Sequence, residues 1–220
     1  MRLVLAALVV TMATAPAVNA GAWLRSKGAG FGSVSATSRG GAAIDGVQTD
    51  ISVFAEYGLA ERLTLGLDVF ERPGTGGHVL LFSRLPLVTG DGPNRLALEL
   101  GIGGHHDKGN WDPMYKAALA FGRGLRDQGW LAADLAVEVR TGQTDPLFKF
   151  DVTYGFPGQY RFRPMVQLET AYADGFGFGW AVIPSLIYTD QNSRRWVMGL
   201  EARSAKTHSF GVKLGIWQNF

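Results

Sequence analysis

The sequence contains no cysteine among its 220 residues. A chain without cysteine has no disulfide bond, no thiolate metal ligand and no lipid-modified N-terminal cysteine. Charged residues are also scarce, at 18%, against roughly 25% in typical soluble domains. Lysine and arginine form no run and the formal net charge is only +2, so the composition does not indicate a nucleic-acid partner.

Beyond the N-terminus the chain also lacks a long hydrophobic run. No later stretch approaches the ~20 apolar residues that a transmembrane helix needs. The N-terminus itself carries a short apolar run at 3–10 and small or tolerated residues at 18–20, a pattern typical of a cleavable signal peptide. We predict a signal peptide over residues 1–20 and a mature chain that starts at Gly21. Cleavage after Ala17 and an uncleaved anchor helix are the alternatives.

Helical periodicity is hard to find after the N-terminal region, whereas period-two alternation is frequent. Apolar residues occupy every second position in five segments, 63–69, 96–102, 131–139, 148–156 and 210–216. The positions between them hold glycine, alanine, small polar or charged residues. Successive side chains of a β-strand point to opposite faces, so these segments are predicted to be strands with one apolar face.

Clusters of Gly, Pro, Asn and Asp separate the apolar segments and predict turns. They divide the chain into about twelve segments of roughly ten residues, the length at which a tilted strand crosses a bilayer. The predicted strands lie near 29–38, 48–59, 62–71, 77–88, 95–105, 114–124, 130–141, 147–156, 161–173, 176–189, 195–204 and 208–220. The loops that would face outward from the cell are predicted near 39–47, 72–76, 106–113, 141–146, 174–175 and 205–207.

The pattern alone fits either a membrane barrel with its apolar face outward or a soluble exported barrel with that face inside. Aromatic residues on the apolar face near strand ends favour the membrane, because such rings suit the headgroup boundary. They are Tyr57, Tyr115, Phe121, Phe148, Phe156, Phe162, Tyr172, Phe176, Tyr188, Trp196 and Phe210. Lipid cannot satisfy an open sheet edge, so residues 21–220 are predicted to form an all-β fold, a closed antiparallel up-and-down transmembrane β-barrel of about 12 strands.

The last ten residues, GVKLGIWQNF, resemble the C-terminal assembly signal of bacterial outer-membrane proteins. Val212, Leu214, Ile216 and the terminal Phe220 match its alternation, and Gln218 departs from it. The resemblance reaches the general class of outer-membrane β-barrel proteins and no characterised family. It implies location in the bacterial outer membrane, contact with outer-membrane lipid and recognition by the barrel-assembly machinery through the last strand. With an even strand count, both chain ends would lie on the periplasmic side.

If the apolar face meets lipid, the opposite face lines the barrel interior. The charged or amide side chains expected there are Asp50, Glu56, Asp68, Glu99, Lys116, Asp134, Glu138, Arg140, Lys149, Asp151, Gln167, Glu169, Glu201, Arg203 and Lys213. Buried charges must pair or stay hydrated. Two hypotheses follow: a structural ion-pair network that fills the barrel, or a narrow aqueous channel whose selectivity these charges set. Leu80 and Phe82 also fall on the inner face, and the sequence offers no reason for them.

Two other groups of residues suggest chemistry, a hydrolase pair and a metal site. His208 and Ser209 suggest a lipid-modifying hydrolase of the outer membrane, but adjacent strand residues point to opposite faces, which separates a nucleophile from its base. The polar segment 105–112 carries two histidines and two aspartates, and a hairpin tip explains it more simply than a metal site. We predict no catalytic residue, no metal and no cofactor, and expect a non-enzymatic outer-membrane barrel that acts as a small-solute channel or a structural envelope protein.

Overall fold

In the computed structural model the described residues are 21–41, 44–89, 92–126, 128–157, 161–205 and 207–220; the predicted signal peptide lies outside them. They form twelve antiparallel strands in one closed barrel, with β1 paired to both β2 and β12. The strands are β1 (Gly30–Gly41), β2 (Ile44–Ala60), β3 (Leu63–Arg72), β4 (Gly76–Val88), β5 (Asn94–Asp107), β6 (Asn110–Gly124), β7 (Trp130–Arg140), β8 (Leu147–Gly155), β9 (Phe162–Ala173), β10 (Gly177–Thr189), β11 (Arg195–Ala205) and β12 (Thr207–Asn219). The predicted fold class is confirmed.

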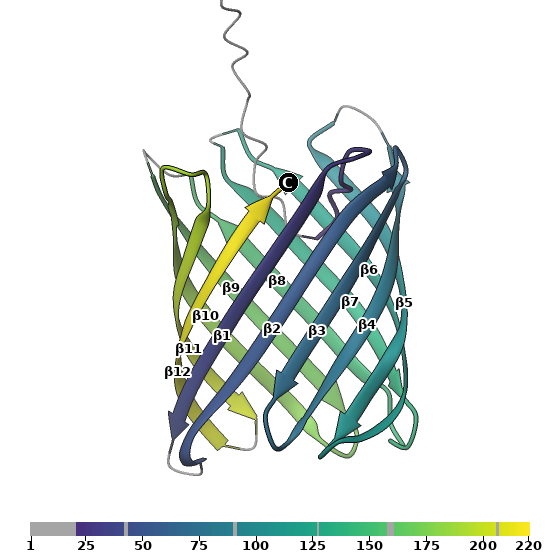
Figure 1. Ribbon diagram of the computed structural model, residues 1–220, viewed down its shortest axis with the longest axis vertical. Helices are drawn as coiled ribbons and strands as arrows, with labels where there is room; N and C mark the ends of the chain where they lie inside the picture. The colour runs from purple at the N-terminus through teal and green to yellow at the C-terminus, as the bar shows by residue number, and fades with distance from the viewer. Residues whose placement is uncertain (1–20, 42–43, 90–91, 127, 158–160, 206) are drawn as a thin grey trace, which may run out of the picture.

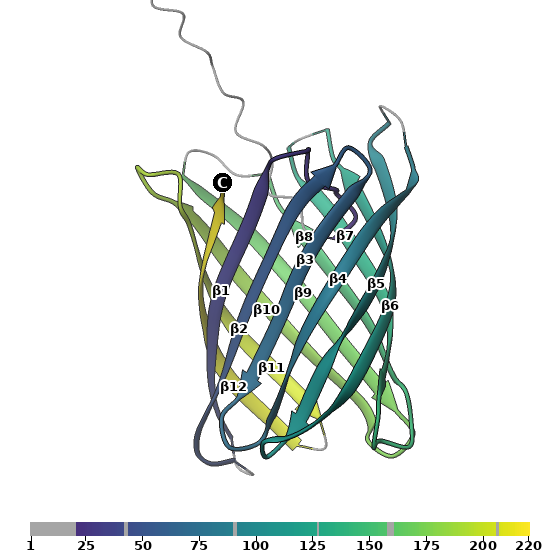
Figure 2. The same ribbon diagram turned by 45° about the vertical axis from the view of Figure 1, so that its right-hand side comes forward.

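Neighbours in sequence are neighbours in space all the way round the barrel, and the strands are strongly tilted (Figures 1 and 2). Gly30 and Asn219 lie at one end, called here the terminal end, which is uppermost in both figures. The other end, called the opposite end, carries the turns after β1, β3, β5, β7, β9 and β11. Within the described chain, no helix is long and apolar enough to cross a bilayer.

The predicted loop at 106–113 is wrong in its extent. Strand pairing continues to Asp107 and Asn110, and only Lys108 and Gly109 connect β5 to β6. Both have positive φ, 49° and 89°, which is the requirement of a two-residue hairpin turn whose twist matches the flanking strands. Residues 106–107 and 110–113, which their polarity assigns to a loop, are therefore strand residues.

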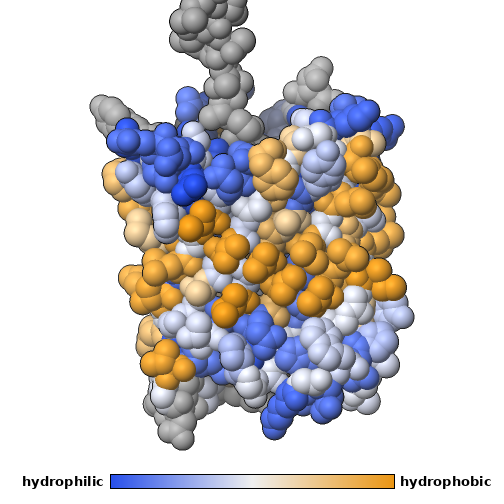
Figure 3. Space-filling view, in the orientation of Figure 1, coloured by the Kyte–Doolittle hydropathy of each residue, from blue (hydrophilic) through white to orange (hydrophobic). Residues whose placement is uncertain are grey.

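Apolar side chains face outward around the whole barrel. Leu81, Ile102 and Leu200 are each at least 60% exposed, and Figure 3 shows a hydrophobic belt at mid-height between two hydrophilic bands. Large contiguous apolar surface is rare on soluble monomers, whereas a belt of this kind matches a hydrocarbon layer. Two sets of outward aromatic residues border the belt: Tyr57, Phe121, Phe156, Phe162, Tyr188 and Trp196 toward the terminal end, and Tyr115, Phe148, Tyr172 and Phe210 toward the opposite end. Phe176, predicted on the apolar face, lies in the turn before β10 and borders the lumen cavity instead.

The structure explains the inward position of Leu80 and Phe82. Both are buried, at 0% and 4% exposure, and each covers a glycine on a neighbouring strand. A Cβ added to Gly66 would lie 2.1 Å from the Phe82 ring, and one on Gly101 would lie 2.8 Å from Leu80. Phe82 also stacks on Phe54, with 5.5 Å between ring centroids. Large inner side chains therefore fill the space that inner glycines leave, as close packing requires.

The sequence predicts no element over residues 21–28. The chain before β1 turns into the terminal end of the barrel, where it is the dark purple trace in Figures 1 and 2. Ala22 is 1% exposed and contacts buried Ala97 and Ala120 on the barrel wall. Residues 22–25 are buried or half-buried inside the barrel, whereas residues 26–28 are exposed.

Candidate functional site: the barrel lumen

Ionic contacts that skip a strand identify the barrel interior, because side chains converge only on the concave side of a closed sheet. Arg84 on β4 reaches past β3 to Glu56 on β2, and its other nitrogen lies 2.7 Å from Glu99 on β5. Lys116 Nζ lies 3.0 Å from the second oxygen of Glu99. Arg84, Glu56 and Glu99 are each under 5% exposed. Each buried charge therefore has a partner of opposite sign, which offsets its desolvation.

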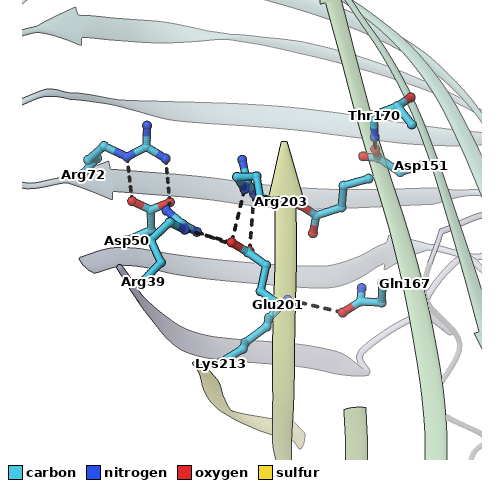
Figure 4. Close-up of polar contacts among 10 residues, drawn as sticks. Arg39, Asp50, Arg72, Asp151, Gln167, Thr170, Glu201, Arg203 and Lys213 are labelled. Atoms are coloured by element: carbon cyan, nitrogen blue, oxygen red, sulfur yellow. Dashed lines mark hydrogen bonds and ion pairs between the residues drawn. The ribbon is translucent and has the colours of Figure 1, made fainter. Parts of the chain in front are cut away.

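A second network lies near the opposite end (Figure 4). Arg39 on β1 contacts Asp50 on β2 and, past β12, Glu201 on β11 at 2.8 Å. Arg72 binds both oxygens of Asp50, at 2.7 and 2.8 Å, and Arg203 lies 3.2 Å from Glu201. The bidentate Arg72 contact is among the stronger ionic geometries. These five side chains join β1, β2, β3 and β11 across the lumen wall.

Other predicted lumen residues form smaller sets of contacts outside these two networks. Glu138 is 2% exposed and pairs with Arg140 at 2.8 Å and with Lys149 at 3.3 Å. The Lys213 ammonium on β12 donates to the Gln167 side chain on β9 at 3.3 Å. This contact passes the two intervening strands β10 and β11, so both side chains extend into the lumen.

Four carboxylates complete the predicted set outside these pairs. Asp68 lies 3.7 Å from His78 Nε2, and Glu169 lies 3.4 Å from Arg203. Asp151 accepts the backbone N–H of Thr170 at 3.0 Å (Figure 4). A fourth, Asp134, faces the start of the segment that enters the barrel: its carboxylate oxygens lie 3.3 Å from the position that a Cβ on Gly21 would take.

A cavity of about 640 Å³ occupies the half of the lumen nearer the opposite end and reaches the turn residues Thr75, Gln143 and Phe176. Its wall includes polar and charged side chains of both signs. Among them are Asp68, Lys149, Asp151, Glu169, Arg203 and Lys213. The described wall carries fixed charges of both signs, and these charges are held mainly by one another.

The half of the lumen nearer the terminal end is filled. Each strand contributes an inward residue that water does not reach there. In strand order they are Phe31, Glu56, Thr64, Arg84, Ala97, Ala120, Ala132, Gly155, Met165, Ile187, Val197 and Gly215. Trp23 and Trp217 pack on the buried cluster that contains Met165, Ile187 and Val197. The lumen is therefore asymmetric, hollow at one end and packed at the other.

Several lumen residues were missed from the sequence: Arg39, Arg72, Arg84 and His78. The strand limits predicted at 38 and 71 left Arg39 and Arg72 in loops, although both strands continue to include them. Arg84 lies two residues beyond Phe82 on the same face of β4. The alternation rule alone places Arg84 inside the barrel. The same rule also places the apolar Leu80 and Phe82 there, so this face of the strand did not resemble a charged lumen wall.

The proposed enzyme and metal residues do not assemble a reactive group. Ser209 is buried, at 5% exposure, while His208 lies on the other face of β12 and is exposed. His105 contacts the backbone oxygen of Thr141, and His106 lies 2.8 Å from Glu71. Among the described residues, no group of three or more metal-capable side chains converges. His105 and His106 are thus engaged separately, by Thr141 and by Glu71.

The C-terminal residues lie on the seam that closes the barrel. Val212 and Leu214 face outward and are more than half exposed, and Ile216 lies on the same face. The Phe220 N–H donates to Gly30 O at 3.0 Å and the Gly30 N–H donates to Phe220 O at 2.7 Å. A Cβ on Gly30 would lie 2.1 Å from the Phe220 ring, so the terminal ring covers the first residue of β1.

No protein-family model matches the sequence, and no curated protein matches it. Solved structures do resemble the barrel. The NanC porin superposes with a TM-score of 0.66 at 8% identity, over 84% of this chain and 98% of that one. The KdgM porin in complex with disordered oligogalacturonate gives 0.59 at 10% identity, over 86% and 99%. An outer-membrane channel from Pseudomonas putida F1 gives 0.58 at 11% identity, over 88% and 96%. The chain thus has the fold of outer-membrane porins and channels.

Proposed function

We propose that this protein is a channel for small polar solutes in the bacterial outer membrane. The observation that carries the proposal is the cavity of about 640 Å³, walled by fixed charges, inside a barrel whose outer surface is an apolar belt. A barrel with a purely structural role would not need a cavity of this size in its lumen. The shared fold with porins and an outer-membrane channel supports the same conclusion.

The proposed orientation puts the terminal end in the periplasm and the cavity toward the cell exterior. A signal peptide over 1–20 would direct export, and Phe220 with the alternating residues before it would be recognised by the assembly machinery. Solutes would then enter from outside through the open cavity. The cavity lies within the 300–1,000 Å³ typical of small-molecule pockets, which suits solutes of sugar or amino-acid size.

The charges in the wall favour solutes that are neutral or carry both signs. Arg39, Arg72 and Arg203 are all engaged by carboxylates, so the wall has no large field of one sign. Selectivity for a strongly anionic or cationic solute needs a ring of like charge. We therefore expect weak ion selectivity and passage of small polar molecules.

The test is solute flux in liposomes together with conductance in planar bilayers, with two variants of β9. Ala171 faces the cavity and Leu168 faces outward. Ala171→Trp should reduce flux by filling the cavity, whereas Leu168→Trp should leave flux unchanged. Equal flux in both variants and in the unaltered protein would contradict passage through this lumen. A folded barrel that admits no solute and carries no current in any form would support the structural role.

A further inference from the structure

We propose that residues 21–27 are a plug that closes the periplasmic end of the channel and withdraws to open it. The inference rests on the proposed channel function and adds the gate. The segment enters the barrel, where residues 22–25 are buried or half-buried, yet it belongs to none of the twelve strands. It occupies the filled half of the lumen, between the cavity and the terminal end.

Apolar contacts hold the first part of the plug. Trp23 packs on the buried cluster of Trp130, Ala132, Met165, Ile187 and Val197, and Leu24 packs on the cluster of Ala22, Ala97 and Ala120. Gly122 on β6 makes room for Trp23, because a Cβ there would lie 2.6 Å from the indole ring. The wall is thus shaped to receive this side chain.

Polar contacts hold the second part. Arg25 Nε lies 2.6 Å from Glu56, its backbone N–H donates to Thr64 Oγ1 at 2.9 Å, and its guanidinium lies 4.6 Å from the Phe31 ring centroid. A single parallel bridge joins Lys27 to Gly58. Most of these attachments involve side chains, so withdrawal of residues 21–27 would leave the ladders that β1 makes with β2 and β12 intact. That separability is what a gate requires.

The start of the plug suggests how it is fastened. The Asp134 carboxylate lies against Gly21, 3.3 Å from the position of a Cβ on that residue. Removal of the predicted signal peptide after residue 20 would make Gly21 the bearer of the α-ammonium group. The new positive charge would then lie beside Asp134 inside the barrel, where an ion pair is weakly screened. This ion pair would stabilise the inserted position of the plug in the mature protein.

A reversible disulfide tests the gate directly, because the chain has no cysteine of its own. Ala22 and Ala120 belong to one buried cluster, so Ala22→Cys with Ala120→Cys should form a single bond between plug and wall. In one bilayer, the oxidised protein should stay closed and reduction should raise the mean current about tenfold or more, because the covalent bond holds residue 22 against β6 until it is reduced. The single variant Ala22→Cys should show no response to reductant.

Two alanine substitutions on β6 give an independent test without a crosslink. Gly122→Ala places a methyl group against the Trp23 ring, whereas a Cβ on Gly124 has no neighbouring atom within 4 Å. Gly122→Ala should raise open probability severalfold, and Gly124→Ala should not. Asp134→Asn should act in the same direction as Gly122→Ala once the N-terminus is processed. Heat-dependent gel mobility verifies that each variant is a folded barrel before its current is recorded.

The outcomes separate the gate from the channel. Current or flux that is the same in the oxidised and reduced forms, and the same in Gly122→Ala and Gly124→Ala, would overturn the plug and leave the channel standing. Silence of every folded form, including reduced protein and Gly122→Ala, would overturn the channel itself. Closure on oxidation with opening on reduction supports both.

Discussion

Replacing Arg84 with methionine should destabilise the barrel far more than the loss of an exposed ion pair would. The guanidinium is 4% exposed and lies between the Glu56 and Glu99 carboxylates, both of which are also buried. Methionine fills a similar volume but provides no charge. The substitution therefore leaves two buried carboxylates that have lost one cation each.

The magnitude follows from the partners that remain. Loss of one partner from a buried ion pair typically costs about 3–5 kcal/mol, and two carboxylates are affected here. Glu56 retains Arg25 at 2.6 Å, and Glu99 retains Lys116 at 3.0 Å, so neither is left without a cation. We therefore expect a loss near the lower limit, about 3 kcal/mol, which is roughly a hundredfold in the folded-to-unfolded ratio.

The assay is equilibrium urea unfolding in lipid vesicles, followed by the fluorescence of the six tryptophans. Arg84→Lys, which preserves the charge but not the two-sided contact, should fall between Arg84→Met and the unaltered protein. Adding Glu99→Gln to Arg84→Met should recover part of the loss, because one excess negative charge disappears. A loss under about 1 kcal/mol for Arg84→Met, the range of exposed ion pairs, would refute the buried network.

Three other changes test separate parts of the fold. Gly66→Ala puts a methyl group 2.1 Å from the Phe82 ring and should lower the free energy of unfolding by about 1–3 kcal/mol in the same titration; no loss would contradict the fitted packing. Leu200→Arg, at the middle of β11 and 65% exposed to the outside, should lower it by about 2–4 kcal/mol; a neutral effect would argue against lipid contact there. Phe220→Ala should reduce the fraction of chains that reach the heat-modifiable folded form in cells; an unchanged fraction would count against the assembly signal.

Strand positions could be predicted well because the membrane leaves little freedom. Lipid on one side of each strand demands an apolar residue at every second position, and the parity of those residues fixes which side chains point inward. Leu100 and Ile102, for example, are exposed outside, while Glu99, directly before Leu100, is buried. The predicted strand limits were wrong mainly at strand ends, as at Arg39 and Asn110, where polar residues continue the pairing beyond the apolar belt.

The contents of the lumen could not be predicted in the same way. Residues 21–27 carry no repeating pattern, and their position depends on space that exists only after the barrel has closed. The fit of Trp23 above Gly122 joins the N-terminus to β6, a contact that no local propensity encodes. Ion-pair partners were equally hidden, because alternation shows that Arg203 and Glu169 face inward but not that they meet past β10.

The most direct test of the account is the environment of spin labels attached along a strand to single cysteines. Labels at Val212 and Leu214 should be accessible to oxygen dissolved in the hydrocarbon and shielded from a water-soluble nickel chelate. A label at Lys213 should show the reverse preference or be shielded from both reagents, and residues 148–150 should repeat the alternation on β8. Oxygen access at Lys213 with chelate access at its two neighbours would mean that the apolar side chains face inward and would contradict the account.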